Sequence, residues 1–244
     1  MDDRFAAPYL ATSRRRVVMG LAALPFVGSA LFGIAEGQEA PVVIPPPGKD
    51  IPANEDSGLA LFAGGCFWGV QGVFQRVKGV KNAVSGYSGG AAETATYDLT
   101  TRGDTGHAET VEVTYDPAIV SYGKLLQIYF SVAHNPTQLN FQGPDRGTQY
   151  RSAIFVQDQN QEDVARAYIA QLDATGRFPA PIVTTLEAFQ AFYPAEQYHQ
   201  DFLTLNPTWP YIVVHDLPKI AALETLFPDQ FRAEPVLVGE LPST

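Results

Sequence analysis

The sequence predicts an α+β fold: a ferredoxin-like split β-α-β core with a mainly antiparallel sheet and extra C-terminal helices. Two observations predict it. Apolar residues switch between strand and helix periods in the order strand, helix, strand, strand, helix, strand, and further helical segments follow this unit. The 244 residues, 45 % hydrophobic and 17 % charged, suffice to bury one core and leave room for tails beside it.

The unit begins with a strand and a helix joined by two glycines. Residues 59–63 form a short apolar run that Gly64-Gly65 stops. Helical spacing then predicts a helix through Lys78, with apolar positions Phe67, Val70, Phe74 and Val77. The predicted order is strand, tight turn, helix.

Two strands follow, separated by a long polar loop. Residues 80–87 have the composition of a strand, and residues 107–115 alternate apolar and polar side chains until Asp116-Pro117 ends them. Residues 88–106 between them are predicted as a loop.

The remaining elements alternate helices and strands. Ser121 is predicted to cap a helix, and Gly176 is predicted to end a second helix that starts at Asp158. The other predicted elements are strands over 150–156 and 182–186 and helices over 195–203 and 217–226.

The first 40 residues resemble a twin-arginine export signal. Consecutive arginines at positions 14–16 precede an apolar stretch over 20–34, which is shorter than the roughly twenty apolar residues that a membrane-spanning helix needs. We expect cleavage near Ala40 and delivery to the periplasm. The alternative is an uncleaved signal that anchors the protein to the inner membrane.

Three further segments follow the signal. Residues 41–56 are rich in proline and are predicted to form an extended linker. The folded, catalytic domain is expected over 57–231, and residues 232–244 form a short tail.

Charge and cysteine content exclude some classes of protein. The formal net charge of −10 makes nucleic acid a poor partner, because binding to phosphates needs clustered Lys and Arg. The single cysteine can form no internal disulfide, so its thiol is either reactive or paired with another molecule. The four histidines and this cysteine show no metal-ligand spacing, and we expect no metal and no cofactor.

Cys66 follows the glycine turn and precedes the predicted helix. Its sulfur should lie beside unpaired backbone N–H groups and the positive end of the helix dipole, which favour the thiolate over the thiol. The alternative is that a lone cysteine packs as a small hydrophobic side chain. The glycine turn and the helix start favour the reactive interpretation.

Glu109 shares the apolar face of the predicted strand over 107–115 with Val111, Val113 and Tyr115. A carboxyl among apolar groups prefers its protonated form, and a raised pKa would make Glu109 a proton donor near neutral pH. A carboxylate at the end of the strand, turned to water, is the alternative that the sequence leaves open.

Aromatic residues gather around the same positions. Phe67 and Trp68 directly follow the thiol, Tyr97 lies in the polar loop, and Tyr150 opens the fourth strand. Such rings are more often part of a core than of a site. Tyrosine hydroxyls can nevertheless donate hydrogen bonds to an oxygen while Phe and Trp rings hold an apolar methyl group.

Five short motifs, taken in order, resemble those of the peptide methionine sulfoxide reductase A family. They are Gly65-Cys66-Phe67-Trp68-Gly69, Ser85-Gly86-Tyr87-Ser88-Gly89-Gly90, Gly106-His107-Ala108-Glu109, Gly147-Thr148-Gln149-Tyr150-Arg151-Ser152 and Tyr198-His199-Gln200-Asp201-Phe202. The resemblance extends from Leu59 to about Ile220.

The resemblance implies that the chain reduces methionine-S-sulfoxide, free or in oxidised proteins, to methionine. It implies that Cys66 is the nucleophile and that Glu109 protonates the sulfoxide oxygen. A sulfoxide sulfur is a good electrophile only when its oxygen is protonated or strongly hydrogen-bonded. Attack at sulfur then releases methionine and leaves Cys66 as a sulfenic acid.

The resemblance also implies substrate-binding roles. Tyr97 and Tyr150 match the hydroxyls that bind the sulfoxide oxygen. Phe67 and Trp68 match the wall around the S-methyl group. Asp145 matches the acidic residue that orients the substrate or a water.

The chain departs from many relatives in two places. It lacks the further C-terminal cysteines that resolve the sulfenic acid, so an external thiol must reduce Cys66, either a small thiol or a thioredoxin-like protein. Asn135 stands where many relatives carry Asp, which leaves the role of that carboxylate open. We expect the protein to act as a monomer.

Two other classes of function stay open at this point. A cysteine-dependent hydrolase or acyltransferase would use His107 or His199 as its base, which needs a spatial pairing that a sequence does not display. A non-catalytic protein that binds methionine-containing segments would use Phe67 and Trp68 as an aromatic clamp.

Overall fold

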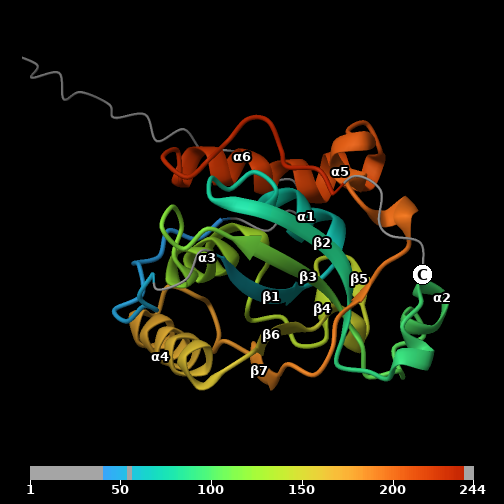
Figure 1. Cartoon of the computed structure of the whole chain (residues 1–244), viewed down its shortest axis with the longest axis horizontal. Helices are drawn as coiled ribbons and strands as arrows, with labels where there is room; N and C mark the ends of the chain where they lie inside the picture. Colours follow the sequence, from blue (N-terminus) through green and yellow to red (C-terminus); the bar gives the residue numbers. More distant parts are fainter. Residues whose placement is uncertain (1–40, 54–56, 239–244) are drawn as a thin grey trace, which may run out of the picture. The chain divides into compact units, whose positions relative to one another are not determined.

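The computed structural model describes residues 41–53 and 57–238 (Figure 1). The predicted export signal over 1–40 lies outside the described residues, as do 54–56 and 239–244. The strands are β1 (Gly58–Gly64), β2 (Val80–Ser88), β3 (Ala108–Tyr115), β4 (Phe141–Gln142), β5 (Asp145–Arg146), β6 (Ser152–Val156), β7 (Thr185–Ala188) and β8 (Tyr193–Pro194). The α-helices are α1 (Phe67–Phe74), α2 (Tyr97–Thr100), α3 (Tyr122–Ile128), α4 (Gln159–Thr175), α5 (Phe202–Leu205) and α6 (Leu217–Leu226). None of the described helices has the length and apolar character needed to cross a membrane.

One sheet organises the described domain, with strand order β7-β6-β1-β3-β2-β8. Neighbouring strands are antiparallel except β6 and β7, which are parallel. The inner order β6-β1-β3-β2 is that of a split β-α-β unit, because β1 and β2 are joined through α1 and separated by β3. The predicted α+β fold with a mainly antiparallel sheet is confirmed, and β4 and β5 form a separate hairpin.

The two faces of β1 are buried against different groups of side chains. Ala60 and Phe62 face the main core, where the Phe62 ring stacks on Phe74 of α1 with centroids 5.0 Å apart. Leu61 and Ala63 point the other way, into a smaller apolar cluster. Because both faces are covered, β1 is held firmly where it delivers the chain to position 66.

The chain crosses the second face of the sheet between β7 and β8, which lie at opposite edges. Phe189 and Phe192 of this crossing pack on the smaller cluster. β8 then pairs with β2, and the chain continues to Phe202, whose ring stacks on Trp68 of α1. The crossing therefore returns the 198–202 motif to the start of α1.

The predicted helix boundaries at Ser121, Asp158 and Gly176 are confirmed. The hydroxyl of Ser121 accepts a hydrogen bond from the backbone nitrogen of Lys124 at 3.2 Å, at the start of α3. The carboxylate of Asp158 accepts one from the backbone nitrogen of Gln161 at 2.8 Å, at the start of α4. Gly176 ends α4 with a left-handed φ of +61°.

Two predicted helices are shorter than their apolar spacing indicated. α1 ends at Phe74 rather than Lys78: the amides of Arg76 and Val77 bond carbonyl groups three residues back, and Val77 pairs with Phe231 in an isolated antiparallel bridge. The predicted helix over 195–203 is a 3₁₀ turn at Gln197–His199, after which Asp201 has φ +58° and α5 begins at Phe202. Apolar spacing does not distinguish a helix from a turn whose side chains enter the same core.

Residues 41–53, the described part of the predicted linker, are extended but packed on the domain. Ile44 is buried in the main core, and its carbonyl oxygen accepts a hydrogen bond from the side-chain amide of Gln127 at 2.9 Å. The hydroxyl of Tyr168 donates to the carbonyl oxygen of Pro45 at 2.7 Å. The composition indicated the extended backbone, but only the folded domain supplies the partners that make this segment a packed strap.

Candidate active site

Cys66 lies where β1 passes into α1. Gly65 has a left-handed φ of +85°, and an added Cβ there would lie 2.5 Å from the side chain of Gln142. Cys66 directly precedes α1 and keeps some exposed surface. The predicted glycine turn into a helix start is therefore confirmed.

Glu109 is buried beside the start of α1. The residue is 3 % exposed, and its Oε2 accepts a hydrogen bond from the backbone nitrogen of Phe67 at 2.9 Å. Burial raises the pKa of Glu109 to about 8, Asp145 adds to the rise, and the Phe67 N–H opposes it. The carboxyl is therefore mostly protonated at neutral pH, and the solvent-facing alternative is wrong.

The thiol of Cys66 is protonated in the free protein. Burial raises its pKa well above the usual range, and the carboxyl groups of Glu109, Asp216 and Asp145 raise it further. A hydrogen bond from the backbone N–H of Trp68 lowers the pKa by less than burial raises it. The predicted effect of the helix start is present in this one amide contact, but desolvation and three acidic neighbours outweigh it.

Phe67 and Trp68 belong to an aromatic cluster next to the thiol. The ring centroid of Phe67 lies 5.1 Å from that of His199. The Trp68 indole stacks on Phe202 at 3.8 Å, and the Tyr211 ring meets it edge-on at 6.0 Å. These rings form an apolar surface that suits a methyl group.

His199 connects the members of this cluster. Its Nδ1 accepts a hydrogen bond from Nε1 of Trp68 at 3.2 Å, and the Tyr97 ring lies 4.4 Å from the imidazole. Because an indole nitrogen only donates, Nδ1 is unprotonated and the imidazole is neutral in this geometry. Burial lowers the pKa of His199, and the charge of Glu196 acts in the opposite sense.

Tyr97 and Tyr150 approach the thiol from two loops. Tyr97 opens α2 within the predicted polar loop, and its backbone nitrogen donates to Oε1 of Glu196 at 2.9 Å. Tyr150 lies in a 3₁₀ turn ahead of β6, not at the start of the strand. Burial raises the pKa of both phenols, and the charges of Glu109 and Cys66 raise it further. Both hydroxyls therefore keep their protons as hydrogen-bond donors.

Asp145 lies in the β4–β5 hairpin. Its Oδ2 accepts a short hydrogen bond from the hydroxyl of Tyr211, and burial raises its pKa. The side-chain amide of Gln142 bonds the backbone nitrogen and oxygen of Asn135 at 3.0 and 2.6 Å, which anchors the hairpin. Oδ1 of Asn135 accepts from the backbone nitrogen of Thr137 at 3.0 Å, a bond that an Asp would also make.

A helical segment near the C-terminus forms a further wall, which the sequence analysis missed. Tyr211, His215 and Lys219 line a cavity of about 20 Å³ together with Cys66, Gln142, Gly143 and Pro144. The three wall residues are four positions apart, so they share one face of the helical run through Ile212–Asp216 and α6. This spacing was the available signal, but it does not indicate what that face contacts.

The hydrolase alternative lacks its base. Nδ1 of His107 accepts from the backbone nitrogen of Gly90 at 3.2 Å, and Nε2 lies 2.9 Å from the carbonyl oxygen of Ala91. Nδ1 of His199 accepts from Trp68 and its Nε2 has no hydrogen-bond partner among the described residues, so neither predicted base is hydrogen-bonded to the thiol. Within the described ranges, no group of three or more His, Cys, Asp or Glu side chains could hold a metal.

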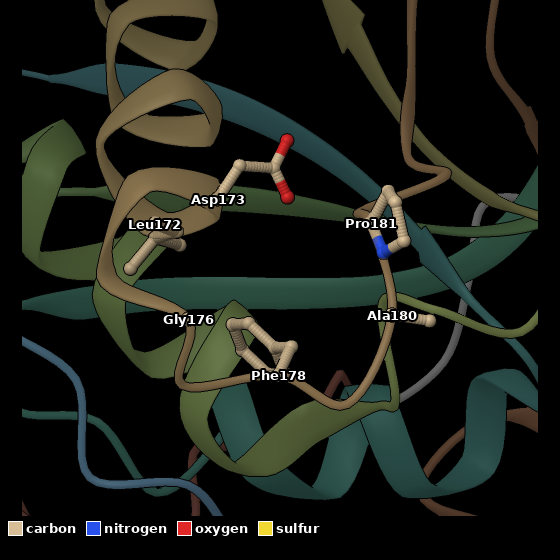
Figure 2. Close-up of a pocket in the computed structure, with 6 residues that line it drawn as sticks. All are labelled: Leu172, Asp173, Gly176, Phe178, Ala180 and Pro181. Carbon is tan, nitrogen blue, oxygen red and sulfur yellow. The ribbon is translucent and has the colours of Figure 1, made fainter.

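A larger hollow of about 410 Å³ shares no residue with this site (Figure 2). It lies at the C-terminal end of α4 and is lined by Leu172, Asp173, Gly176, Phe178, Ala180 and Pro181. Its one ionisable lining residue, Asp173, accepts a hydrogen bond from the backbone nitrogen of Ile182 at 2.9 Å and so holds the following loop. Size therefore does not mark the reactive site in this protein.

Comparisons with known proteins agree with this geometry. A family model for peptide methionine sulfoxide reductase matches residues 58–230. The peptide methionine sulfoxide reductase MsrA 2 of Mesorhizobium japonicum is 65 % identical over 189 residues, which cover 78 % of this chain and 97 % of that protein. The MsrA 2 of Synechocystis is 51 % identical over 196 residues, which cover 79 % and 92 %.

Two solved structures are similar to this chain. Mxr1 from Saccharomyces cerevisiae in reduced form matches with a TM-score of 0.58 and 31 % identity, covering 68 % of this chain and 94 % of that one. Methionine sulfoxide reductase A of Corynebacterium diphtheriae matches with a TM-score of 0.52 and 31 % identity, covering 72 % and 89 %. The chain therefore belongs to the peptide methionine sulfoxide reductase A family and reduces methionine-S-sulfoxide to methionine.

Proposed function

We propose that Cys66 is the nucleophile of this reduction and that Glu109 is its proton donor. One observation carries the proposal: the 2.9 Å hydrogen bond between the backbone nitrogen of Phe67 and Oε2 of Glu109. This bond holds an acid with a pKa of about 8 beside the residue that bears the thiol. A neutral acid next to a nucleophilic sulfur is what sulfoxide reduction requires.

In the proposed reaction the oxygen moves from one sulfur to another. The Cys66 sulfur attacks the sulfoxide sulfur while Glu109 gives its proton to the sulfoxide oxygen. The S–O bond breaks, methionine leaves, and the hydroxyl ends on Cys66 as a sulfenic acid. The thiol proton passes to Glu109, so the acid is restored, the substrate sulfur is reduced and the Cys66 sulfur is oxidised.

The substrate is proposed to lie between the two tyrosines and the aromatic cluster. Tyr97 and Tyr150 would bind the sulfoxide oxygen, because their raised pKa values keep both hydroxyls as donors. Phe67 and Trp68 would hold the S-methyl group. Asp145 would orient the substrate or a water from the hairpin side.

The sulfenic acid must be reduced from outside the chain, which has no second cysteine. We propose that an external thiol forms a mixed disulfide with Cys66 and that a second thiol releases it. The donor is either a small thiol or a thioredoxin-like dithiol protein. The residues proposed for the site all belong to one chain, which supports a monomeric enzyme.

The twin-arginine motif supports export to the periplasm, with the signal removed near Ala40 or retained as an anchor. Replacing Arg14, Arg15 and Arg16 together by Lys tests this proposal. We expect the full-length precursor to accumulate in the cytoplasm. Unchanged periplasmic activity of that variant would contradict a twin-arginine route.

Single-turnover chemistry tests the proposed nucleophile. The protein is mixed with the S or the R epimer of a methionine sulfoxide peptide in the absence of any reductant. We expect the S epimer to yield one methionine per chain and Cys66 to gain one oxygen in mass. The control variant Cys66→Ser should give neither product, and oxygen found on another residue would contradict the proposal.

A further inference from the structure

Two charged residues at the start of α6 are packed near the thiol and take no part in the chemistry above. Nζ of Lys219 lies 3.3 Å from Oδ1 of Asp216, and their side chains are 15 % and 0 % exposed. A buried ion pair adds little stability, because the desolvation of both charges offsets their attraction. The placement of this pair therefore calls for another explanation.

The pair lies directly on the first turn of α1. A Cβ added at Gly69 would overlap Oδ1 of Asp216 and would lie 2.9 Å from Nζ of Lys219. Gly69 is three residues after Cys66, so the absence of a side chain there lets both charged groups approach the helix start that carries the thiol.

Lys219 also borders the cavity beside the thiol. Lys219 and Cys66 line the same space of about 20 Å³, which has room for about one water molecule. Oδ2 of Asp216 is buried without a hydrogen-bond partner in the described part of the chain. The charge of Asp216 is close enough to raise the pKa of the Cys66 thiol. An oxygen atom on the Cys66 sulfur would therefore have room in this cavity, next to Lys219.

We propose that Lys219, held in place by Asp216, donates the proton that the Cys66 sulfenic acid needs when an external thiol reduces it. This inference rests on the proposed function, which forms that sulfenic acid. The attacking thiolate forms an S–S bond to Cys66, and the S–O bond breaks with its electron pair on oxygen. The ammonium proton of Lys219 converts that oxygen into water.

The second thiol completes the reduction of Cys66. It attacks the mixed disulfide, gives its proton to the Lys219 amine, and leaves as part of a disulfide. The Cys66 thiolate released in this step takes up a proton and becomes a thiol again. Two thiols are thereby oxidised to one disulfide, and the sulfenic acid is reduced to a thiol and water.

Glu109 is poorly suited to this step because of its pKa. Ordinary thiols become thiolates near pH 8.5, whereas Glu109 loses its proton at about pH 8. The Asp216 carboxylate, 3.3 Å from Nζ of Lys219, instead favours the charged form of the ammonium group. Among the described residues, the titratable side chains around the thiol and Lys219 are Glu109 of β3, His134, Asp145 of β5, Tyr97, Tyr150, Tyr211, His215 and Asp216, and Lys219 is the amine of this group.

The test separates the two half-reactions in Lys219→Met, which keeps the length of the side chain and removes its charge. The sulfenic acid is formed with a peptide sulfoxide, dithiothreitol is added, and the loss of the oxygen is followed by intact mass. We expect the sulfenic acid of Lys219→Met to be reduced about 100-fold more slowly than that of the wild type. Above pH 8 the difference should be larger. Methionine release should fall far less than this reduction.

Two further variants distinguish a proton donor from a balancing charge. Lys124→Met removes a half-buried ammonium on α3, outside the cavity. The sulfenic acid of this variant should be reduced at the wild-type rate. Asp216→Asn combined with Lys219→Met removes both charges. Its sulfenic acid should be reduced as slowly as that of Lys219→Met alone. If Lys219→Met does not fold, Lys219→Gln replaces it in both measurements.

The outcomes are distinct. Recovery of the wild-type rate in the double variant would overturn the proposal, because Lys219 would then serve only to offset Asp216. A wild-type reduction rate in Lys219→Met would overturn it as well. Failure of the wild-type protein to release methionine would instead contradict the proposed function.

Discussion

The backbone nitrogen of Phe67 donates a hydrogen bond to Oε2 of Glu109 at 2.9 Å, across 42 positions of the chain. This bond uses one of the amide groups that a helix start leaves unpaired and attaches a β3 side chain to α1. The hydrogen bond therefore holds the carboxyl of Glu109 against Phe67, the residue that follows Cys66. The proton donor and the nucleophile are thereby kept at a fixed position relative to each other.

Glu109→Gln is expected to lower the turnover number about 100-fold or more while changing KM little. The amide oxygen still accepts the bond from Phe67, but the side chain has no acidic proton to give. Steady-state kinetics with a peptide sulfoxide measures both parameters. An unchanged turnover number would remove Glu109 from the mechanism.

Methionine release is expected to decline as pH rises through about 8, because Glu109 loses its proton there. Single-turnover rates measured without reductant on both sides of this pH check the expectation. The control is Glu109→Gln, whose residual rate should not show this decline. A wild-type rate that keeps rising with pH would point to thiol ionisation as the controlling step.

The free energy of unfolding should also depend on the ionisation of Glu109. The pKa of Glu109 is about 8 in the folded protein against an ordinary 4.5, so the folded state binds a proton that the unfolded state has lost between these values. The free energy of unfolding contributed by this group therefore falls as pH rises, by up to about 1.4 kcal/mol per pH unit. Denaturant unfolding should show a steeper fall for the wild type than for Glu109→Gln, and identical slopes would refute the buried acid.

Gly69→Ala is expected to destabilise the protein by about 2 kcal/mol, because the new Cβ overlaps Oδ1 of Asp216. Activity should fall as well, since the clash displaces the first turn of α1. Thermal unfolding and single-turnover assays measure the two effects. Asp216→Ala in the same chain removes the overlapping atoms and should recover part of the lost stability; no recovery would place the strain elsewhere.

Ile44→Ala is expected to lower the free energy of unfolding by about 2 kcal/mol, although residue 44 lies in a segment whose composition is that of a linker. Val43→Ala is the matched control, because its side chain is 63 % exposed and should cost almost nothing. Equal effects in urea unfolding would mean that the strap does not pack on the domain in solution.

Local patterns predicted most of the fold. The alternation of Ala60 and Phe62 with Leu61 and Ala63 follows from the strand period. Helix starts and stops follow from side chains and glycines that act within one turn, such as Asp158. The strap and the left-handed Asp201 escaped prediction, because their hydrogen bonds reach segments distant in sequence.

The candidate site was likewise predicted only in part from local patterns. Cys66 at a glycine turn and Glu109 on an apolar strand face are properties of neighbouring residues, which a sequence displays. The wall residues Tyr211, His215 and Lys219 are also evenly spaced in the sequence. Their contact with the cavity beside the thiol, however, results from the crossing of the chain over the sheet.

The sequence by itself determined the strand and helix order, the glycine turn that leads to Cys66 and the apolar face that carries Glu109, because these are set by spacing and local backbone preference. Only the tertiary structure decided that the free thiol is protonated and that Asp216 and Lys219 lie on Gly69. Desolvation and charge interactions depend on which distant segments surround a group, and that arrangement exists only after the chain has folded.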